Sequence, residues 1–249
     1  MKIEDVQNEL DAIYKKYYKK EDLIKLKNTE SLSAPFVLKI YEEYLVSPIK
    51  IMFVGKEVNE WHTMLDKIMY DVNLIEIMKN RYQREFDTEK GWGTAFFRMY
   101  KNVRKQLTND NPGAVIWNNL LKFSYDTSGT SSKNSIGHSK ELEKISISIL
   151  QEEIKILKPN FIIFTTSTGQ GYDRVIKESF NETYTDKSLY IEHNIWKFKT
   201  KLYDENNSDI NCICYRTRHP NETSFKGDDE NTVQELYQLI MDDIKKELS

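Results

Sequence analysis

The sequence is poor in cysteine, glycine and proline: its 249 residues include two cysteines, nine glycines and five prolines. Two cysteines exclude a cysteine-ligated iron–sulfur cluster and a four-cysteine zinc site. Cys212 and Cys214 share one face of a predicted strand and are poorly placed for a disulfide, so we interpret them as small strand residues in a reducing compartment. The scarce glycines also matter, because Gly169-Gln170-Gly171 lacks the third glycine of a dinucleotide-binding fingerprint.

Long apolar runs and an excess of positive charge are also missing. No apolar run approaches the ~20 residues that span a bilayer, and the first residues are charged, so we expect a cytoplasmic protein without a membrane partner. The net charge of −3 gives no global basic field, so any contact with nucleic acid must come from a local patch. Lys101, Arg104 and Lys105 are one candidate patch, with a solvated helix face as the alternative.

Apolar and aromatic residues are abundant enough for a core, at 39% and 12% of the chain. Apolar segments predict strands, and apolar residues at helical spacing predict helices between them. The predicted strands cover 51–54, 114–117, 161–164 and 211–217, and the clearest helices cover 3–17, 96–107, 142–156 and 233–244. This alternation predicts a largely parallel sheet covered on both faces.

Other segments complete the predicted architecture. Ser33 and Pro35 predict the start of a helix, residues 124–138 a surface loop, and residues 189–203 a hairpin. Thr232 and Glu235 match a capping box before the last helix. We expect one α/β domain over residues 1–249, with residues 1–46 as a helical decoration.

Polar residues follow the first and the last predicted strands. The first strand is predicted to break at Gly55 into a polar run that includes Glu57, and the last ends in Arg218-His219-Pro220-Asn221. Ligands of open α/β sheets bind outside the carboxyl ends of the strands. We therefore expect Glu57 and His219 to face a common site as an acid/base pair.

Four short motifs occur in order at predicted strand ends. They are Gly55-Lys56-Glu57-Val58-Asn59, Asn119-Leu120-Leu121-Lys122, Lys158-Pro159 before the strand 161–164, and His219-Pro220-Asn221. Together they resemble the motifs of the uracil-DNA glycosylase superfamily, over about residues 48–224. Val58 departs from the usual proline, and Asn59 stands where strictly uracil-specific members carry tyrosine.

The resemblance implies a three-layer α/β/α fold with a mostly parallel sheet of four strands. It also implies a hydrolase that cleaves the N-glycosidic bond of a flipped, uracil-like base in single- or double-stranded DNA, without a metal or organic cofactor. Glu57 would orient a water or stabilise positive charge on the sugar, and His219 would donate to the oxygen that becomes negative. The expected substrate-binding residues are Gly55, Asn59, Trp92, Asn119, Thr166 and Asn221.

Structural alternatives stay open for these residues. Glu57 can instead pair with Lys56 or a helix amino terminus, Asn119 can cap a helix, Trp92 can belong to the core, and Thr166 to a plain turn. The function also has alternatives. The same fold can hold a nucleobase, a nucleotide or modified DNA without cleaving it, or the chain can be an unrelated nucleotide-binding α/β protein.

Overall fold

The computed structural model describes residues 2–26, 31–58, 63–88, 93–127, 130–133, 139–167, 171–180, 185–191, 194–200, 202, 210–222 and 232–249. The chain divides into two compact units. The first unit contains residues 1–40, 56–90 and 119–157, and the second contains residues 41–55, 91–118 and 158–249. The expectation of one domain over the whole chain stays a prediction. Within the described ranges, no helix has the length and apolar character needed to cross a membrane.

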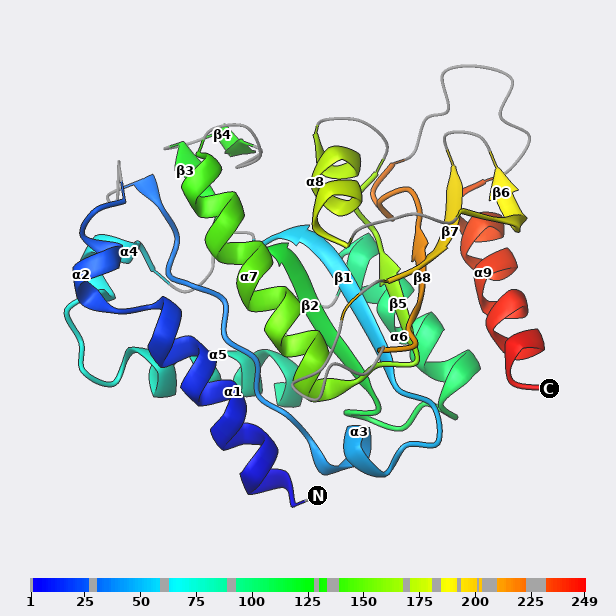
Figure 1. Ribbon diagram of the computed structural model, residues 1–249, viewed down its shortest axis with the longest axis horizontal. Coiled ribbons are helices and arrows are strands. Elements are labelled where there is room, and N and C mark those ends of the chain that lie inside the picture. Colours follow the sequence, from blue (N-terminus) through cyan, green and yellow to red (C-terminus); the bar gives the residue numbers. More distant parts are fainter. Residues whose placement is uncertain are drawn as a thin grey trace. The chain divides into compact units, whose positions relative to one another are not determined.

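The main sheet has six strands in the order β2-β1-β5-β8-β7-β6 (Figure 1). Their bounds are β1 Ile51–Glu57, β2 Val115–Leu121, β5 Phe161–Phe164, β6 Thr185–Ile191, β7 Ile195–Lys199 and β8 Ile213–Arg216. β1, β5 and β8 run parallel to one another. β7 runs antiparallel to β8, and β6 runs antiparallel to β7. The expected α/β class with a mostly parallel sheet is therefore confirmed. The expected four strands become six, because the predicted hairpin forms β6 and β7 and extends the sheet beyond β8.

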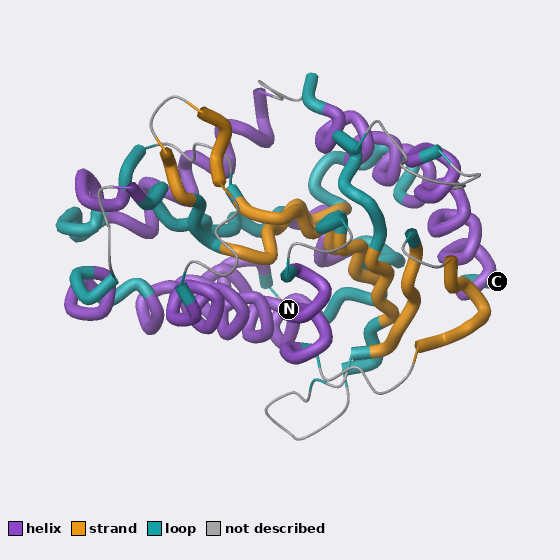
Figure 2. The backbone as a smooth tube through the Cα atoms, turned by 90° about the horizontal axis from the view of Figure 1, so that it is seen from above, coloured by secondary structure: helices purple, strands orange, loops and turns teal. Residues whose placement is uncertain are grey.

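Helices of the second unit contact both faces of its sheet. α6 Ala95–Leu107 and α9 Val233–Glu247 contact one face and the end of α8 Tyr172–Ser179 contacts the other, and this unit also contains the short helix α3 Glu42–Val46. Phe53 of β1 contacts Phe96 of α6 and Tyr237 of α9. Phe164 pairs with Val54, the residue after Phe53, so it faces the opposite side, where its ring contacts Phe180 at the end of α8. Figure 2 shows the strands in orange and the helices in purple.

The first unit is built mainly from helices. They are α1 Ile3–Tyr17, α2 Lys20–Leu23, α4 Leu65–Ile68, α5 Leu74–Thr88 and α7 Lys140–Leu157. α1 packs against α7 and α5 (Figure 1). A small hairpin of β3 Tyr125–Thr127 and β4 Thr130–Lys133 also belongs to this unit. The expected surface loop at 124–138 thus contains two short strands.

The segment around Ser33 and Pro35 is extended, so the helix predicted there is wrong. Residues 32–38 are all buried, and apolar side chains without a polar face do not suit a surface helix. Neighbouring segments satisfy the backbone instead. Phe36 N donates to the Lys122 oxygen (2.8 Å), and Ala34 N donates to the Thr63 oxygen (2.7 Å). Tertiary hydrogen bonds and burial therefore override the local start signal.

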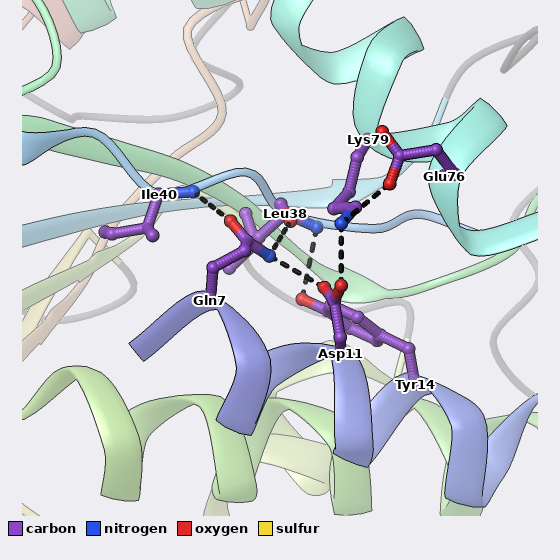
Figure 3. A network of polar contacts seen from close by, with 7 residues as sticks. All are labelled: Gln7, Asp11, Tyr14, Leu38, Ile40, Glu76 and Lys79. Atoms are coloured by element: carbon purple, nitrogen blue, oxygen red, sulfur yellow. Dashed lines mark hydrogen bonds and ion pairs between the residues drawn. The ribbon is translucent and has the colours of Figure 1, made fainter. Parts of the chain in front are cut away.

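A polar network ties this extended segment to α1 and α5 (Figure 3). Gln7 Oε1 accepts from Ile40 N (2.9 Å), and Gln7 Nε2 donates to Asp11 Oδ1 (2.9 Å). Lys79 of α5 pairs with Asp11 Oδ2 (2.6 Å) and with Glu76 (2.9 Å). The network supplies partners for backbone groups that an isolated extended segment would leave unpaired.

A second network of the first unit is completely buried. Lys122 Nζ lies 2.6 Å from Glu153 Oε2, and both side chains are 0% exposed. Tyr14 donates its hydroxyl to Glu153 Oε1 (2.6 Å) and accepts from Leu38 N (3.1 Å). Burial lowers the pKa of the Lys122 ammonium, while the Glu153 carboxylate acts in the opposite direction. Lys122 is therefore an internal ion-pair residue of this unit.

Candidate functional site

Backbone hydrogen bonds hold the carboxyl ends of three parallel strands in one row in the second unit. Thr165 N donates to the Val54 oxygen (2.8 Å), which joins the end of β5 to β1. Thr217 N donates to the Phe164 oxygen (2.9 Å), and Ser167 N donates to the Thr217 oxygen (3.2 Å). The ladder between β5 and β8 thus continues beyond the strands, and the polar residues that follow them keep fixed positions.

Ser167 has an unusual backbone conformation at this row. Its φ of 67° lies in the left-handed region, which costs a residue other than glycine about 1–2 kcal/mol. The side chain is buried, and its Oγ accepts a hydrogen bond from His219 N (3.2 Å). Ser167 therefore contacts the end of β8 through both its amide and its hydroxyl, and these bonds fix where the His219 loop begins.

The His219 ring is held in one orientation. Its Nδ1 accepts a hydrogen bond from Asn221 N (3.2 Å), and its ring stacks on Phe96 of α6 with centroids 6.0 Å apart and planes 20° apart. Because Nδ1 accepts, the proton of the neutral ring lies on Nε2. His219 is half-buried, and its loop follows the carboxyl end of β8.

A tyrosine of α9 supports the same loop. Tyr237 donates its hydroxyl to the Arg218 oxygen (2.9 Å), and its side chain is fully buried. Burial raises the pKa of the Tyr237 phenol well above its ordinary value, so the hydroxyl keeps its proton. Arg218 itself donates Nε to Asn194 Oδ1. The backbone on the amino-terminal side of His219 is therefore fixed by two different elements.

Two threonine hydroxyls at the strand ends are buried without a hydrogen-bond partner in the described part of the chain. They belong to Thr166, after β5, and to Thr217, after β8, and both residues are 0% exposed. Buried polar atoms are nearly always hydrogen-bonded in folded proteins, and exceptions often mark functional positions. Thr165 differs, because its Oγ1 donates to the Val54 oxygen (3.0 Å).

A hollow of about 640 Å³ opens beside Pro220, the residue after His219. Its walls are α6 and the first turns of α9, including Arg98, Asn102 and Gln238. This volume is in the range of small-molecule sites, about 300–1,000 Å³. A smaller hollow of about 320 Å³ includes Asn160 and Phe161 at the opposite, amino ends of the strands, where α/β sheets do not usually bind ligands.

The structure brings together part of the predicted site. Thr166, His219 and Asn221 lie at the strand ends of the second unit, and Gly55 is buried inside β1 of the same unit. Asn59 and Trp92 lie outside the described residues. The second unit therefore presents a histidine, a buried hydroxyl and the Asn221 amide within one set of loops.

Glu57 and Asn119 belong to the first unit, and their local structure differs from the expectation. The break predicted at Gly55 is wrong, because β1 continues to Glu57, whose side chain is half-buried. Asn119 lies inside β2 and is 2% exposed, so the alternative of a helix cap is also wrong. In both cases the strand is longer than its apolar run, since the sheet pairs backbone groups whatever their side chains are.

Sequence reasoning missed two residues of this site, Phe96 and Thr217. Phe96 was expected only in the apolar stripe of a helix, yet it lies against His219 and is half-buried. Thr217 carries the backbone hydrogen bonds described above. Ser167 lies in the polar run after the strand 161–164 that sequence reasoning singled out together with Thr166, but its hydrogen bond with His219 was not expected. The proposed basic patch also changes, because Arg104 is 6% exposed and pairs with Asp110 (2.7 Å).

Comparison with known proteins gives no family for this chain. Neither a protein-family model nor a curated protein matches it. The resemblance to the uracil-DNA glycosylase superfamily therefore rests on the four motifs and on their positions near strand ends, and it stays a prediction.

Proposed function

We propose that this chain is a uracil-DNA glycosylase-like hydrolase that binds a flipped base beside His219 and cleaves its N-glycosidic bond. The observation that supports this most is the His219 loop. Its Nδ1 accepts from Asn221 N, so the proton of the neutral ring is on Nε2 and the loop after β8 carries a hydrogen-bond donor. We also propose that the fold is a three-layer α/β/α arrangement and that the helices before β1 are an extension of it.

The reaction needs two kinds of stabilisation. As the bond between the base nitrogen and the anomeric carbon breaks, the base takes the electron pair and negative charge develops on its oxygen. His219 Nε2–H donates to that oxygen, and such a donor contributes about 10²–10³-fold in rate. A water oxygen then bonds to the anomeric carbon, and its proton passes to the base. The Glu57 carboxylate orients this water and stabilises the cation-like sugar. Neither step requires a metal or organic cofactor.

The remaining roles come from the resemblance and, for Phe96, from its contact with His219. Phe96, with its ring against His219, supplies an aromatic face for the base, in addition to the role proposed for Trp92. Asn119 reads the edge of the base through its amide, because an amide offers both a donor and an acceptor. Thr166 and Asn221 contact the nucleotide, and Gly55 and Asn59 line the base pocket as in the resembling family.

A direct test is the formation of abasic sites in DNA. Single- and double-stranded oligonucleotides that contain one uracil are incubated with the protein, and abasic sites are detected by alkaline strand cleavage. We expect cleavage at the uracil only. The variant His219→Gln should lose about 10²–10³-fold in rate, because a transition-state donor is changed.

Glu57 needs a matched control, because any lost carboxylate changes the net charge. Glu57→Gln should abolish activity, while Glu152→Gln, which removes a half-exposed carboxylate paired with Lys155, should not alter it. No abasic site with any uracil or related substrate, under conditions in which the protein is folded, contradicts the proposal.

A second candidate is a binding module that holds a nucleobase or modified DNA without cleaving it. The observation that favours it is Val58, which is 1% exposed and stands where the resembling family usually has proline. A buried valine after a continuous strand gives this segment a different backbone from a proline turn. DNA binding by the wild type without abasic-site formation, unchanged by Glu57→Gln, would support the module.

A further inference from the structure

The corner between α1 and α2 carries four lysines within six residues. All four side chains, Lys15, Lys16, Lys19 and Lys20, are exposed. Tyr18, in the middle of the segment, is 5% exposed, and its ring stacks on Tyr14 with centroids 5.9 Å apart. Its hydroxyl donates to the Phe36 oxygen (2.9 Å). Tyr18 thus anchors the corner to the first unit, while the lysines extend into solvent.

These lysines lack the partners that other lysines of the chain have. Among the described residues, no carboxylate lies within 4.0 Å of any of the four, whereas Lys25 pairs with Asp22 (2.8 Å) and Lys155 with Glu152 (3.0 Å). The positive charges therefore repel one another. Their repulsion is a cost that an anionic ligand would remove.

Helix stability explains only half of this cluster. Lys15 and Lys16 lie in the last turn of α1, where positive charge is favourable. Lys19 and Lys20 are the N-cap and the first residue of α2, which is only four residues long. A single turn has too small a macrodipole to account for this second pair of lysines.

An exposed tyrosine lies next to these charges. Lys20 Nζ is 4.9 Å from the centre of the Tyr70 ring, and Tyr70, just after α4, is 57% exposed. Figure 1 shows α2 beside α4, in agreement with this contact. Lys16 Nζ lies 4.9 Å from the ring of Tyr17 in the same way. The surface therefore combines positive charge with aromatic rings.

We propose that Lys15, Lys16, Lys19, Lys20 and Tyr70, the lysine corner, bind single-stranded nucleic acid. The lysines neutralise phosphates, and Tyr70 stacks on an unpaired base, which a duplex does not expose. The inference rests on the proposed function only for the class of ligand, because the lysine corner holds a strand whether or not a base is excised. It replaces the patch of Lys101, Arg104 and Lys105, whose arginine is buried.

The test measures binding of a short fluorescent oligonucleotide of mixed sequence without uracil, by anisotropy over a series of salt concentrations. The full chain is compared with a fourfold variant, Lys15→Gln, Lys16→Gln, Lys19→Gln and Lys20→Gln. The matched control changes four other exposed lysines, Lys105→Gln, Lys140→Gln, Lys144→Gln and Lys246→Gln. Both variants lose four positive charges, so a difference in binding between them shows that the position of the lysines matters.

We expect the lysine-corner variant to lower the slope of log affinity against log salt by about 0.7 for each phosphate that is no longer neutralised, up to about 3 in total. The control should bind like the wild type. Tyr70→Ala should weaken binding at least about fivefold without changing the slope, because stacking is not ionic.

Three results would overturn the inference. Equal losses in the two fourfold variants would indicate a general charge effect, and no loss in either would place the binding surface elsewhere. Loss of binding to phosphatidylserine vesicles, with binding to the oligonucleotide unchanged, would assign the lysine corner to a membrane. Because the oligonucleotide contains no uracil, failure here leaves the abasic-site test of the proposed function untouched.

Discussion

Two clusters of buried polar groups, one in each unit, differ in whether the groups have partners. In the first unit, Lys122, Glu153 and Tyr14 are fully buried, and their charged and hydroxyl groups contact one another at 2.6 Å. In the second unit, the hydroxyls of Thr166 and Thr217 are equally buried, but no described group bonds to them. In the first cluster every polar group named here has a hydrogen-bond or ion-pair partner within the protein. In the second, two hydroxyl groups at the strand ends have none among the residues that the structure describes and are available to a ligand.

This difference separates residues kept for stability from residues available to a ligand. Removing one member of a satisfied buried network leaves an uncompensated charge, which costs several kcal/mol. Removing a buried hydroxyl that has no partner takes away only an unfavourable group. Mutations at the two places should therefore have opposite profiles: large losses of stability in the first unit, and losses of binding in the second.

The largest effect is expected at Glu153. Glu153→Ala leaves the Lys122 ammonium buried without its carboxylate, and we expect a loss of about 3–5 kcal/mol in the free energy of unfolding. The double variant Lys122→Met with Glu153→Leu removes both charges and should lose much less. Urea denaturation of both proteins measures the difference. Equal losses would show that packing, rather than the buried charge, dominates this site.

Ser167 is expected to have the next largest effect. Ser167→Ala keeps the left-handed strain and leaves His219 N without its acceptor, so we expect a loss of about 1–2 kcal/mol in unfolding free energy. Ser167→Gly also loses the acceptor, but it relieves about 1 kcal/mol or more of backbone strain. Glycine should therefore be the more stable of the two variants by thermal and urea unfolding. The reverse order would contradict the strained position of Ser167.

The exposed capping box of α9 is an intermediate case, in which polar groups are satisfied at the surface. Thr232 Oγ1 accepts from Glu235 N, and the Glu235 carboxylate accepts from Thr232 N. Thr232→Ala should cost about 1 kcal/mol. Urea unfolding measures this loss, and an unchanged stability would show that the box contributes little.

The same box predicts a pH dependence. The backbone hydrogen bond from Thr232 lowers the pKa of Glu235 below its ordinary value of 4.5. A lowered folded-state pKa means that the stabilisation is present above the unfolded pKa and is lost as the pH falls through the folded pKa. Glu235→Ala should therefore be less stable than wild type at neutral pH, and the gap should close in acid. A gap that persists in acid would contradict this assignment.

The smallest effect on stability is expected at the unpartnered hydroxyls. Thr166→Val and Thr217→Val have nearly the same shape as threonine, and removing the hydroxyl should leave the free energy of unfolding unchanged or raise it by up to about 1 kcal/mol. Each should nevertheless weaken binding of a uracil-containing oligonucleotide. Clear destabilisation by either substitution would remove the contrast between these hydroxyls and the buried network of Lys122, Glu153 and Tyr14.

Much of the sheet was predictable from the sequence, because its strands are short apolar runs bounded by clear breaks. The run Phe161–Phe164 is uniformly apolar and follows Pro159, which marks the end of the preceding helix, and the strand is buried throughout. The capping box and the β6–β7 hairpin were likewise local signals. Strand ends were less predictable, as β1 and β2 show, because pairing with neighbours extends a strand past its apolar residues into Glu57 and Asn119.

The segment after Ser33 shows the opposite limit. Its Ser-x-Pro start signal is local, whereas the hydrogen bonds that keep it extended come from Gln7, Tyr14 and Lys122, far away in the sequence. The candidate site has the same character. The position of His219 after a strand indicated that it belongs to the site. No pattern in the sequence indicated that Ser167 would take a φ of 67° and accept a hydrogen bond from His219 N, or that Phe96 would lie against the His219 ring.

The tautomer of His219 tests the central claim most directly, because the proposed donor exists only if its proton is on Nε2. Nitrogen-15 NMR of the histidine rings at neutral pH, with His219→Gln to assign the signal, distinguishes the two neutral forms. We predict a protonated Nε2 and an unprotonated Nδ1, with a shift of the Nε2 signal when uracil-containing DNA is added. A proton on Nδ1, or a signal that does not respond to the DNA, would contradict the proposed site.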